Sequence, residues 1–300
     1  MKTCTIYTNC QGGAIEKYLA FHPTFNQEYE TQFVMLDRNT LSQPMSDEIK
    51  DRLSRTDLFI HMHLTPASGI VRFSRLAPLL AQEYQTDTII NELLPKDCVR
   101  VSIPNAHFEG YHLEYCREPR FLQTVTEQNP VGTFFYGNRS LINLIKKSAP
   151  LTSKKIAEII KHLNRGDLYS SSEIDGSFRR SIGILRQREA ICDVQVADLI
   201  VDNFIDRHLF HSVNHPSAFI MNHIVAGILK KAGLQPMSYV DKEFFNSLQV
   251  PIAPCVLKHY GFKFNTGEMR YRVDALNASF THDEYWLKYI CTLYPELLDL

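Results

Sequence analysis

The chain has 300 residues, of which 44% are hydrophobic and 22% charged, as is typical of a globular protein with one large or two modest domains. Its formal net charge of −1 gives no overall attraction to nucleic acid or to a membrane surface. The seven cysteines form no C-x-x-C pair, which argues against a zinc site and fits a reducing compartment. The first apolar run is too short for a signal peptide, and no stretch is long enough to span a membrane. We therefore expect a cytoplasmic protein without a bound metal.

Strand-like and helix-like segments alternate over the first hundred residues. β-Branched and aromatic runs predict strands at residues 3–8, 31–36, 57–61 and 98–103. Helical periodicity predicts helices at residues 11–21, 47–53 and 73–84. This order is typical of βαβ units and a parallel sheet.

The second half of the sequence is dominated by helical patterns. We expect helices at residues 140–147, 153–164, 181–210, 217–232, 242–248 and 282–298, with residues 164–177 as a loop. Strands are not evident there. The predicted fold is therefore α/β, with a parallel-sheet half of the SGNH or flavodoxin-like kind at residues 1–135. A mainly helical half follows at residues 136–300, and we expect the two halves to share one core.

Polar residues follow three of the predicted strands. In open parallel sheets, ligands bind outside the carboxyl ends of the strands. The residues that collect at this edge are Asn9, Cys10 and Gln11 after the first strand, His61 and His63 after the third, and Asn105 and His107 after the fourth. The sequence therefore predicts a functional site at this edge.

Cys10 lies where the first strand meets the first helix. A helix N-terminus favours a thiolate, which is the reactive form of cysteine. We expect the amides of Gln11 and Gly12 to be unpaired and able to bind an oxyanion, and Gly12 to let a substrate approach the backbone. The alternative is a small buried cysteine that only fills the corner.

Several histidines are candidates for a general base. Asn214 and His215 form a turn before a predicted helix, and His215 is the first candidate. His63 and His107 are the second. We expect His61 and His63 to face opposite sides of their strand, and the pair is a weak metal motif without a matching carboxylate set. His22 follows a helix of about 15 Å, which would place it far from Cys10.

A basic stretch runs from Arg139 to Arg165, with seven Lys or Arg residues and one acidic residue, Glu158. One interpretation is a solvated helix face, and the other is a binding site for a phosphorylated ligand. The candidates for phosphate contacts are Arg139, Lys146, Lys147, Lys154 and Lys155. No GxxxxGK[ST] or GxGxxG motif supports nucleotide binding of the P-loop or Rossmann kind.

Four short segments in the same order resemble the WcbI-type polysaccharide biosynthesis family. They are TNCQ at residues 8–11, HPTF at 22–25, IPNAHFEGYH at 103–112 and LFHSVNHPS at 209–217. The resemblance implies a capsule-sugar O-acetyltransferase that uses acetyl-coenzyme A, with Cys10 as the reactive centre and His22 beside it. It also gives the basic stretch a candidate ligand, the phosphates of coenzyme A.

A looser resemblance links the chain to SGNH esterases. There Cys10 would take the place of the serine nucleophile, Asn105 that of the asparagine and His215 that of the histidine. Ser212 stands where the family has an aspartate, three residues before the histidine. The alternatives to acetyl transfer are therefore a cysteine esterase and a sugar-binding module without catalysis.

In the leading hypothesis, a sugar or polysaccharide hydroxyl accepts the acetyl group. Either Cys10 carries it as a thioester while a histidine activates the hydroxyl, or a histidine activates the hydroxyl for direct transfer. Polar support for the oxyanion or substrate is expected from Asn9, Gln11, Gly12, Asn105 and Asn214.

Overall fold

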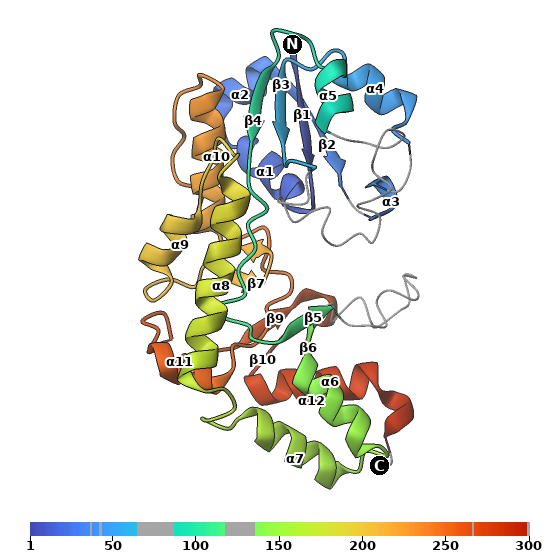
Figure 1. Cartoon of the computed structure of the whole chain (residues 1–300), viewed down its shortest axis with the longest axis vertical. Coiled ribbons are helices and arrows are strands. Elements are labelled where there is room, and N and C mark those ends of the chain that lie inside the picture. The colour runs from blue at the N-terminus through green and yellow to red at the C-terminus, as the bar shows by residue number, and fades with distance from the viewer. Residues whose placement is uncertain (37, 42–43, 65–86, 118–135, 266, 299–300) are drawn as a thin grey trace. The chain divides into compact units, whose positions relative to one another are not determined.

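The structure is a computed structural model that describes residues 1–36, 38–41, 44–64, 87–117, 136–265 and 267–298. The described chain forms two compact units, which alternate along the sequence. The first comprises Met1–Ala106, Ile182–Val201 and Ser217–Phe244. The second comprises His107–Ser181, Asp202–Pro216 and Phe245–Leu300. Figure 1 shows the elements of both units, coloured along the sequence.

A four-stranded parallel sheet forms the centre of the first unit, in the order β2-β1-β3-β4 (Figure 1). Its strands are β1 (Lys2–Thr8), β2 (Tyr29–Met35), β3 (Leu58–His61) and β4 (Val99–Ser102). The last five residues of β1 are all buried, as expected for a central strand that is covered on both faces. The predicted α/β fold with a parallel sheet is confirmed.

The register of the sheet brings the strand ends together at one edge. Tyr7 of β1 lies opposite His61 of β3, and His61 lies opposite Ser102 of β4. Cys10, His63 and Asn105 follow these positions by two or three residues. The chain passes from β1 to β2 on one side and returns to β3 on the other, so Cys10 lies at the switch point where open sheets bind ligands.

The helices of the first unit include those predicted at residues 11–21, 47–53 and 217–232, and also three at residues 23–28, 38–41 and 87–93 that were not predicted. They are α1 (Gln11–Leu19), α2 (Pro23–Glu28), α3 (Arg38–Leu41), α4 (Asp47–Leu53), α5 (Asp87–Leu93), α9 (Ala197–Asn203) and α10 (Ala218–Lys231). Helix α1 packs against β2 and α10, and α4 packs against α5. The helix expected at residues 73–84 lies outside the described residues.

Helices and short antiparallel ladders make up the second unit. The helices are α6 (Arg139–Ser148), α7 (Ser153–Leu163), α11 (Pro254–Tyr260) and α12 (His282–Leu293), with a 3-10 turn at Pro295–Leu297. Helix α8 (Ser171–Glu189) starts in this unit and ends in the first. A core of apolar residues from α6, α7 and α12 includes Leu141, Ile145, Ile156, Ile159 and Tyr289.

Three expectations for the second half were wrong. Short strands exist there: β6 (Tyr136–Asn138), which pairs with β5 (Tyr115–Arg117) of the first half, β7 (Phe210–Ser212), β8 (His215–Pro216), β9 (Tyr271–Val273) and β10 (Ala278–Phe280). Runs of two or three residues are too short to show alternation of apolar and polar side chains. Residues 242–248 form no helix, and α8 begins inside the predicted loop at residues 164–177.

The expected domain boundary after residue 135 lies at the edge of a range that the structure does not describe, and it stays a prediction. Among the described residues, no helix is both long enough and apolar enough to cross a membrane.

Candidate active site

A network of hydrogen bonds holds the segment that carries Cys10. The side chain of Gln11 pairs with the backbone of Ala106 in both directions: Nε2 donates to the carbonyl at 2.7 Å, and Oε1 accepts from the amide at 3.2 Å. The side chain of Asn9 donates from Nδ2 to Oδ1 of Asn105 at 3.0 Å. Only 1% of Gln11 and 5% of Asn105 is exposed. The network therefore ties the end of β1 to the segment after β4, with Gln11 and Asn105 buried and Asn9 half-buried.

Cys10 itself is the N-cap residue of α1, with φ −52° and ψ −19°, and it is half-buried. Its thiol makes no capping hydrogen bond to the helix. The positive end of the helix dipole favours an anionic sulfur at this position. The first strand, the first helix and the network thus hold a cysteine at the switch point of the sheet.

The two backbone amides that we expected to be unpaired both have acceptors. The amide of Gln11 donates to Oδ1 of Asn9 at 2.9 Å, and the amide of Gly12 donates to the carbonyl of Asn9 at 3.0 Å. The premise of an oxyanion site built from these two amides was therefore wrong. In the structure Asn9 and Gln11 position the loop around Cys10, and their contact with a substrate stays a prediction.

Gly12 is required for packing within the protein. A Cβ atom at this position would lie 2.2 Å from Oγ1 of Thr8 and 2.4 Å from the ring of Phe33. At Gly13 the nearest atom would be 3.5 Å away, an ordinary contact. Glycine is therefore needed at position 12 so that α1 can pack closely against the sheet. This contact gives no support to the expectation that Gly12 makes room for a substrate.

His22 caps α2 and has partners on both ring nitrogens. Its Nδ1 accepts from the amide of Phe25 at 3.0 Å, and its Nε2 donates to the carbonyl of Gln235 at 2.9 Å. It follows the C-terminal end of α1, whereas Cys10 precedes the N-terminal end. These contacts support a structural role for His22, and a catalytic role beside Cys10 stays a prediction.

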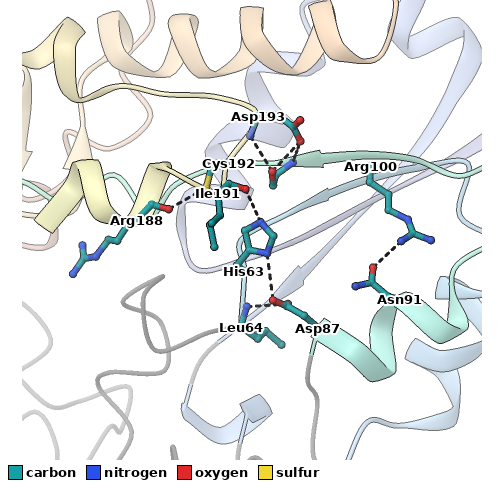
Figure 2. Close-up of polar contacts among 10 residues, drawn as sticks. His63, Leu64, Asp87, Asn91, Arg100, Arg188, Ile191, Cys192 and Asp193 are labelled. Atoms are coloured by element: carbon teal, nitrogen blue, oxygen red, sulfur yellow. Dashed lines mark hydrogen bonds and ion pairs between the residues drawn. The ribbon is translucent and has the colours of Figure 1, made fainter.

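His63 lies in the first unit between Asp87 and Ile191, as Figure 2 shows. Its Nδ1 is 3.3 Å from Oδ2 of Asp87, and its Nε2 is 3.1 Å from the carbonyl oxygen of Ile191. The hydrogen bond with Asp87 raises the pKa of His63, although partial burial opposes it. Burial works to raise the pKa of Asp87, but the bonds from His63 and the amide of Leu64 leave it lowered. A ring with both nitrogens engaged is poorly placed to take a proton from a substrate.

His61 and His63 do not face opposite sides. Their ring centroids are 4.9 Å apart, in an edge-to-face arrangement. The expectation was wrong because residues two apart on a strand share a face. Burial first, and His63 second, lower the pKa of His61 to about 4, so this ring is neutral near pH 7.

The remaining candidate bases, His107 and His215, belong to the second unit. His107 is buried, with Nδ1 3.8 Å from Oε1 of Glu109. The ring of His215 stacks on Phe245 at 5.0 Å, and burial lowers its pKa to about 4. Asn214 accepts a hydrogen bond from the hydroxyl of Tyr136. A catalytic role for His107, His215 or Asn214 stays a prediction.

The predicted phosphate contacts lie on α6 and α7. Lys146, Lys147 and Lys154 are exposed, as is Arg139 at the start of α6. Lys155 differs, because its Nζ donates to the carbonyls of Ser148 and Pro150, both at 2.8 Å. Lys155 therefore closes the end of α6, and the other four side chains are the better candidates for a ligand.

Asp87 is the residue near the site that the sequence analysis missed. It lies 24 positions from His63 and has no motif around it. Its role comes from the fold, which places the first residue of α5 beside the end of β3. The sequence offered one signal for Asp87: an acidic residue at the start of a helical pattern, where Asp and Glu are favoured.

The fold and the site define an α/β protein with a half-buried cysteine at the switch point of a parallel sheet. Comparison with family models matches residues 3–237 to the family described as polysaccharide biosynthesis enzyme WcbI. The match spans more than half of the chain, so this protein belongs to the WcbI family of polysaccharide biosynthesis enzymes. The resemblance in the four sequence segments is confirmed.

A solved structure of WcbI has the same fold, with a TM-score of 0.68 and 18% sequence identity. The similarity covers 96% of this chain and 88% of the other. That structure is described as the native protein without a disulfide bond between coenzyme A and one of its cysteines. No curated protein sequence matches this chain.

Proposed function

We propose that this enzyme transfers an acetyl group from acetyl-coenzyme A to a hydroxyl of a sugar or polysaccharide, with Cys10 at the reaction centre. The observation that carries the proposal is the position of Cys10: half-buried, at the positive end of α1, in a loop fixed by the Gln11–Ala106 pair. The description of the solved WcbI structure, which mentions coenzyme A and a cysteine, supports the choice of donor.

The proposed reaction has two steps. The Cys10 thiolate attacks the acetyl carbonyl carbon, the carbon–sulfur bond to coenzyme A breaks, and the coenzyme A thiolate leaves and takes up a proton. The sugar hydroxyl oxygen then attacks the acetyl-cysteine thioester, its proton passes to a base, and Cys10 is released as a thiolate. The net products are the sugar acetate and coenzyme A.

Direct transfer is the competing mechanism, in which Cys10 only positions the donor. The two mechanisms differ in one measurable species, the acetylated Cys10. After incubation with acetyl-coenzyme A and no acceptor, mass spectrometry of the intact protein should show a gain of one acetyl group, and analysis of its peptides should place that group in the peptide that contains Cys10. Cys10→Ala should lose this gain, whereas Cys291→Ala, at another half-buried cysteine, should keep it.

Donor binding is tested separately by calorimetry with coenzyme A and acetyl-coenzyme A. Binding that survives in Cys10→Ala, together with absence of the acetylated peptide in the wild type, would favour direct transfer. Absence of binding to both ligands would refute the donor, and release of acetate from simple esters would then favour the cysteine esterase.

The basic stretch gives the phosphate groups of coenzyme A a proposed binding site. Because Lys155 is engaged at the end of α6, the sharper test uses Lys147→Glu and Lys154→Glu, two exposed positions. Each should weaken donor binding several-fold, and more at low salt, since charge attraction is screened by ions. Lys96→Glu, an exposed lysine in the first unit with the same charge change, is the matched control.

A further inference from the structure

Three potential metal ligands converge at the end of β3. A ring nitrogen of His61, a ring nitrogen of His63 and a carboxylate oxygen of Asp87 all lie within 4.8 Å of one another. The three side chains are partly buried, so the group is shielded yet reachable from solvent. His61 and His63 come from the strand and the residues after it, and Asp87 is the first residue of α5.

The contacts of His63 point to a cation in this group. Its Nε2 faces the carbonyl oxygen of Ile191, which only accepts hydrogen bonds, so Nε2 carries a hydrogen (Figure 2). Its Nδ1 faces an oxygen of Asp87, and a carboxylate also only accepts. Without a positive charge between them, the lone pairs of Nδ1 and the carboxylate would repel each other. The charge is carried either by a proton or by a metal ion.

The geometry around this pair also fits a metal site. Two ligands at about 2.1 Å from a tetrahedral zinc ion are about 3.4 Å apart, and Nδ1 of His63 lies 3.3 Å from Oδ2 of Asp87. The bond from Nε2 of His63 to a backbone carbonyl is the outer bond that metal-binding histidines usually make. The second oxygen of Asp87 accepts from the amide of Leu64 at 2.9 Å, which fixes the carboxylate.

The position of His61 favours a metal ion over a proton as the positive charge between His63 and Asp87. A proton shared by His63 and Asp87 needs no third partner, whereas a metal ion needs further ligands. The ring of His61 stacks on Phe59 at 4.8 Å, which holds it beside His63. Its nitrogen lies within 4.8 Å of the ligand atoms of His63 and Asp87, and it has to move to about 3.4 Å from them to share a tetrahedral ion.

We propose that His61, His63 and Asp87 bind a divalent transition-metal ion of the zinc type. Two imidazoles and one carboxylate suit zinc and its neighbours, and three protein ligands leave a coordination position open. The bound ion would link the end of β3 to the start of α5. No metal was expected from the sequence because the carboxylate is 24 residues from His63 and forms no local motif with the histidines.

The test is a titration of the purified, EDTA-treated full chain with Zn²⁺ by calorimetry, and with Co²⁺ by visible absorption. We expect one equivalent to bind, with Co²⁺ spectra that show nitrogen and oxygen ligands. Asp87→Asn keeps an acceptor for the amide of Leu64, and His61→Phe keeps an aromatic ring on Phe59. Each should weaken binding at least tenfold while circular dichroism stays unchanged.

Asp175→Asn is the matched control, because Asp175 pairs with His259 at 2.8 Å in another His–Asp pair. It should leave the metal affinity unchanged. Absence of a bound equivalent, or binding that survives in both Asp87→Asn and His61→Phe, would overturn the proposal. Strong near-ultraviolet charge-transfer bands would also overturn it, since they would place the ion on cysteine thiolates.

Discussion

Gln11 is the residue whose removal should test the architecture of the site most directly. Gln11→Ala deletes both hydrogen bonds to Ala106 and leaves the amide and carbonyl of that fully buried residue without partners. Each unpaired buried group costs about 1–3 kcal/mol, so we expect a loss of about 2–6 kcal/mol in the free energy of unfolding. That is a large share of the stability of a typical domain.

Urea denaturation followed by far-ultraviolet circular dichroism measures this loss. Fluorescence is less suitable, because the only tryptophan, Trp286, lies in the second unit. Gln187→Ala, at an exposed glutamine of the first unit, should change the unfolding free energy by less than about 0.5 kcal/mol. An effect of Gln11→Ala no larger than that of Gln187→Ala would refute the reasoning.

A second substitution tests the hydrogen bond that the Gln11 side chain donates to Ala106 separately from the one that it accepts. Gln11→Glu keeps an oxygen that can accept from the amide of Ala106, but it places a second oxygen against the Ala106 carbonyl. When the introduced carboxyl is protonated it can donate to that carbonyl again. Relative to the wild type, the Gln11→Glu variant should therefore be more stable at acidic pH than at neutral pH.

Other predictions concern packing and acid stability. Gly12→Ala should lower the unfolding free energy by about 1–3 kcal/mol through overpacking, whereas Gly13→Ala, with ordinary space for a Cβ, should be neutral or slightly stabilising in the same urea assay. Burial lowers the pKa of His112 to about 4, of His208 to about 3 and of His215 to about 4. Between pH 6.5 and 4 the unfolded chain therefore binds more protons than the folded one, so stability should fall on acidification by about 1.4 kcal/mol per pH unit for each histidine. Tryptophan fluorescence during urea unfolding at pH 7 and pH 5 measures this, and equal unfolding free energies at the two pH values would contradict it.

The sheet was predictable from the sequence because its strands carry dense, local signals. The apolar run at Leu58–His61 is a buried strand, and the serial order of strands and helices predicts parallel pairing. The same argument predicts that Asn9 and Asn105 meet at one edge, and they do so through a 3.0 Å hydrogen bond. Short strands such as β6 and β9 were not predictable, because three residues are too few to show an alternating pattern.

The chemistry of individual side chains was harder to predict than their location. Whether the amide of Gln11 is unpaired depends on the rotamer of Asn9, and the sequence does not encode that rotamer locally. The role of Asp87 depends on a helix that starts beside a strand end far away in the sequence. His22 was the opposite case, because the length of the first helix predicted that His22 follows its far end, as the structure shows.

The alternation of the two units along the chain bears on how the protein folds during synthesis. All four strands of the sheet leave the ribosome before the second unit begins at His107. Helix α10, which packs against α1, emerges only after the second unit's first two segments. Until then the apolar surface of α1 lacks its neighbour, and contacts between such distant segments form slowly. The sheet should therefore reach its final stability late in synthesis, and a fragment ending at residue 135 should expose apolar surface and aggregate.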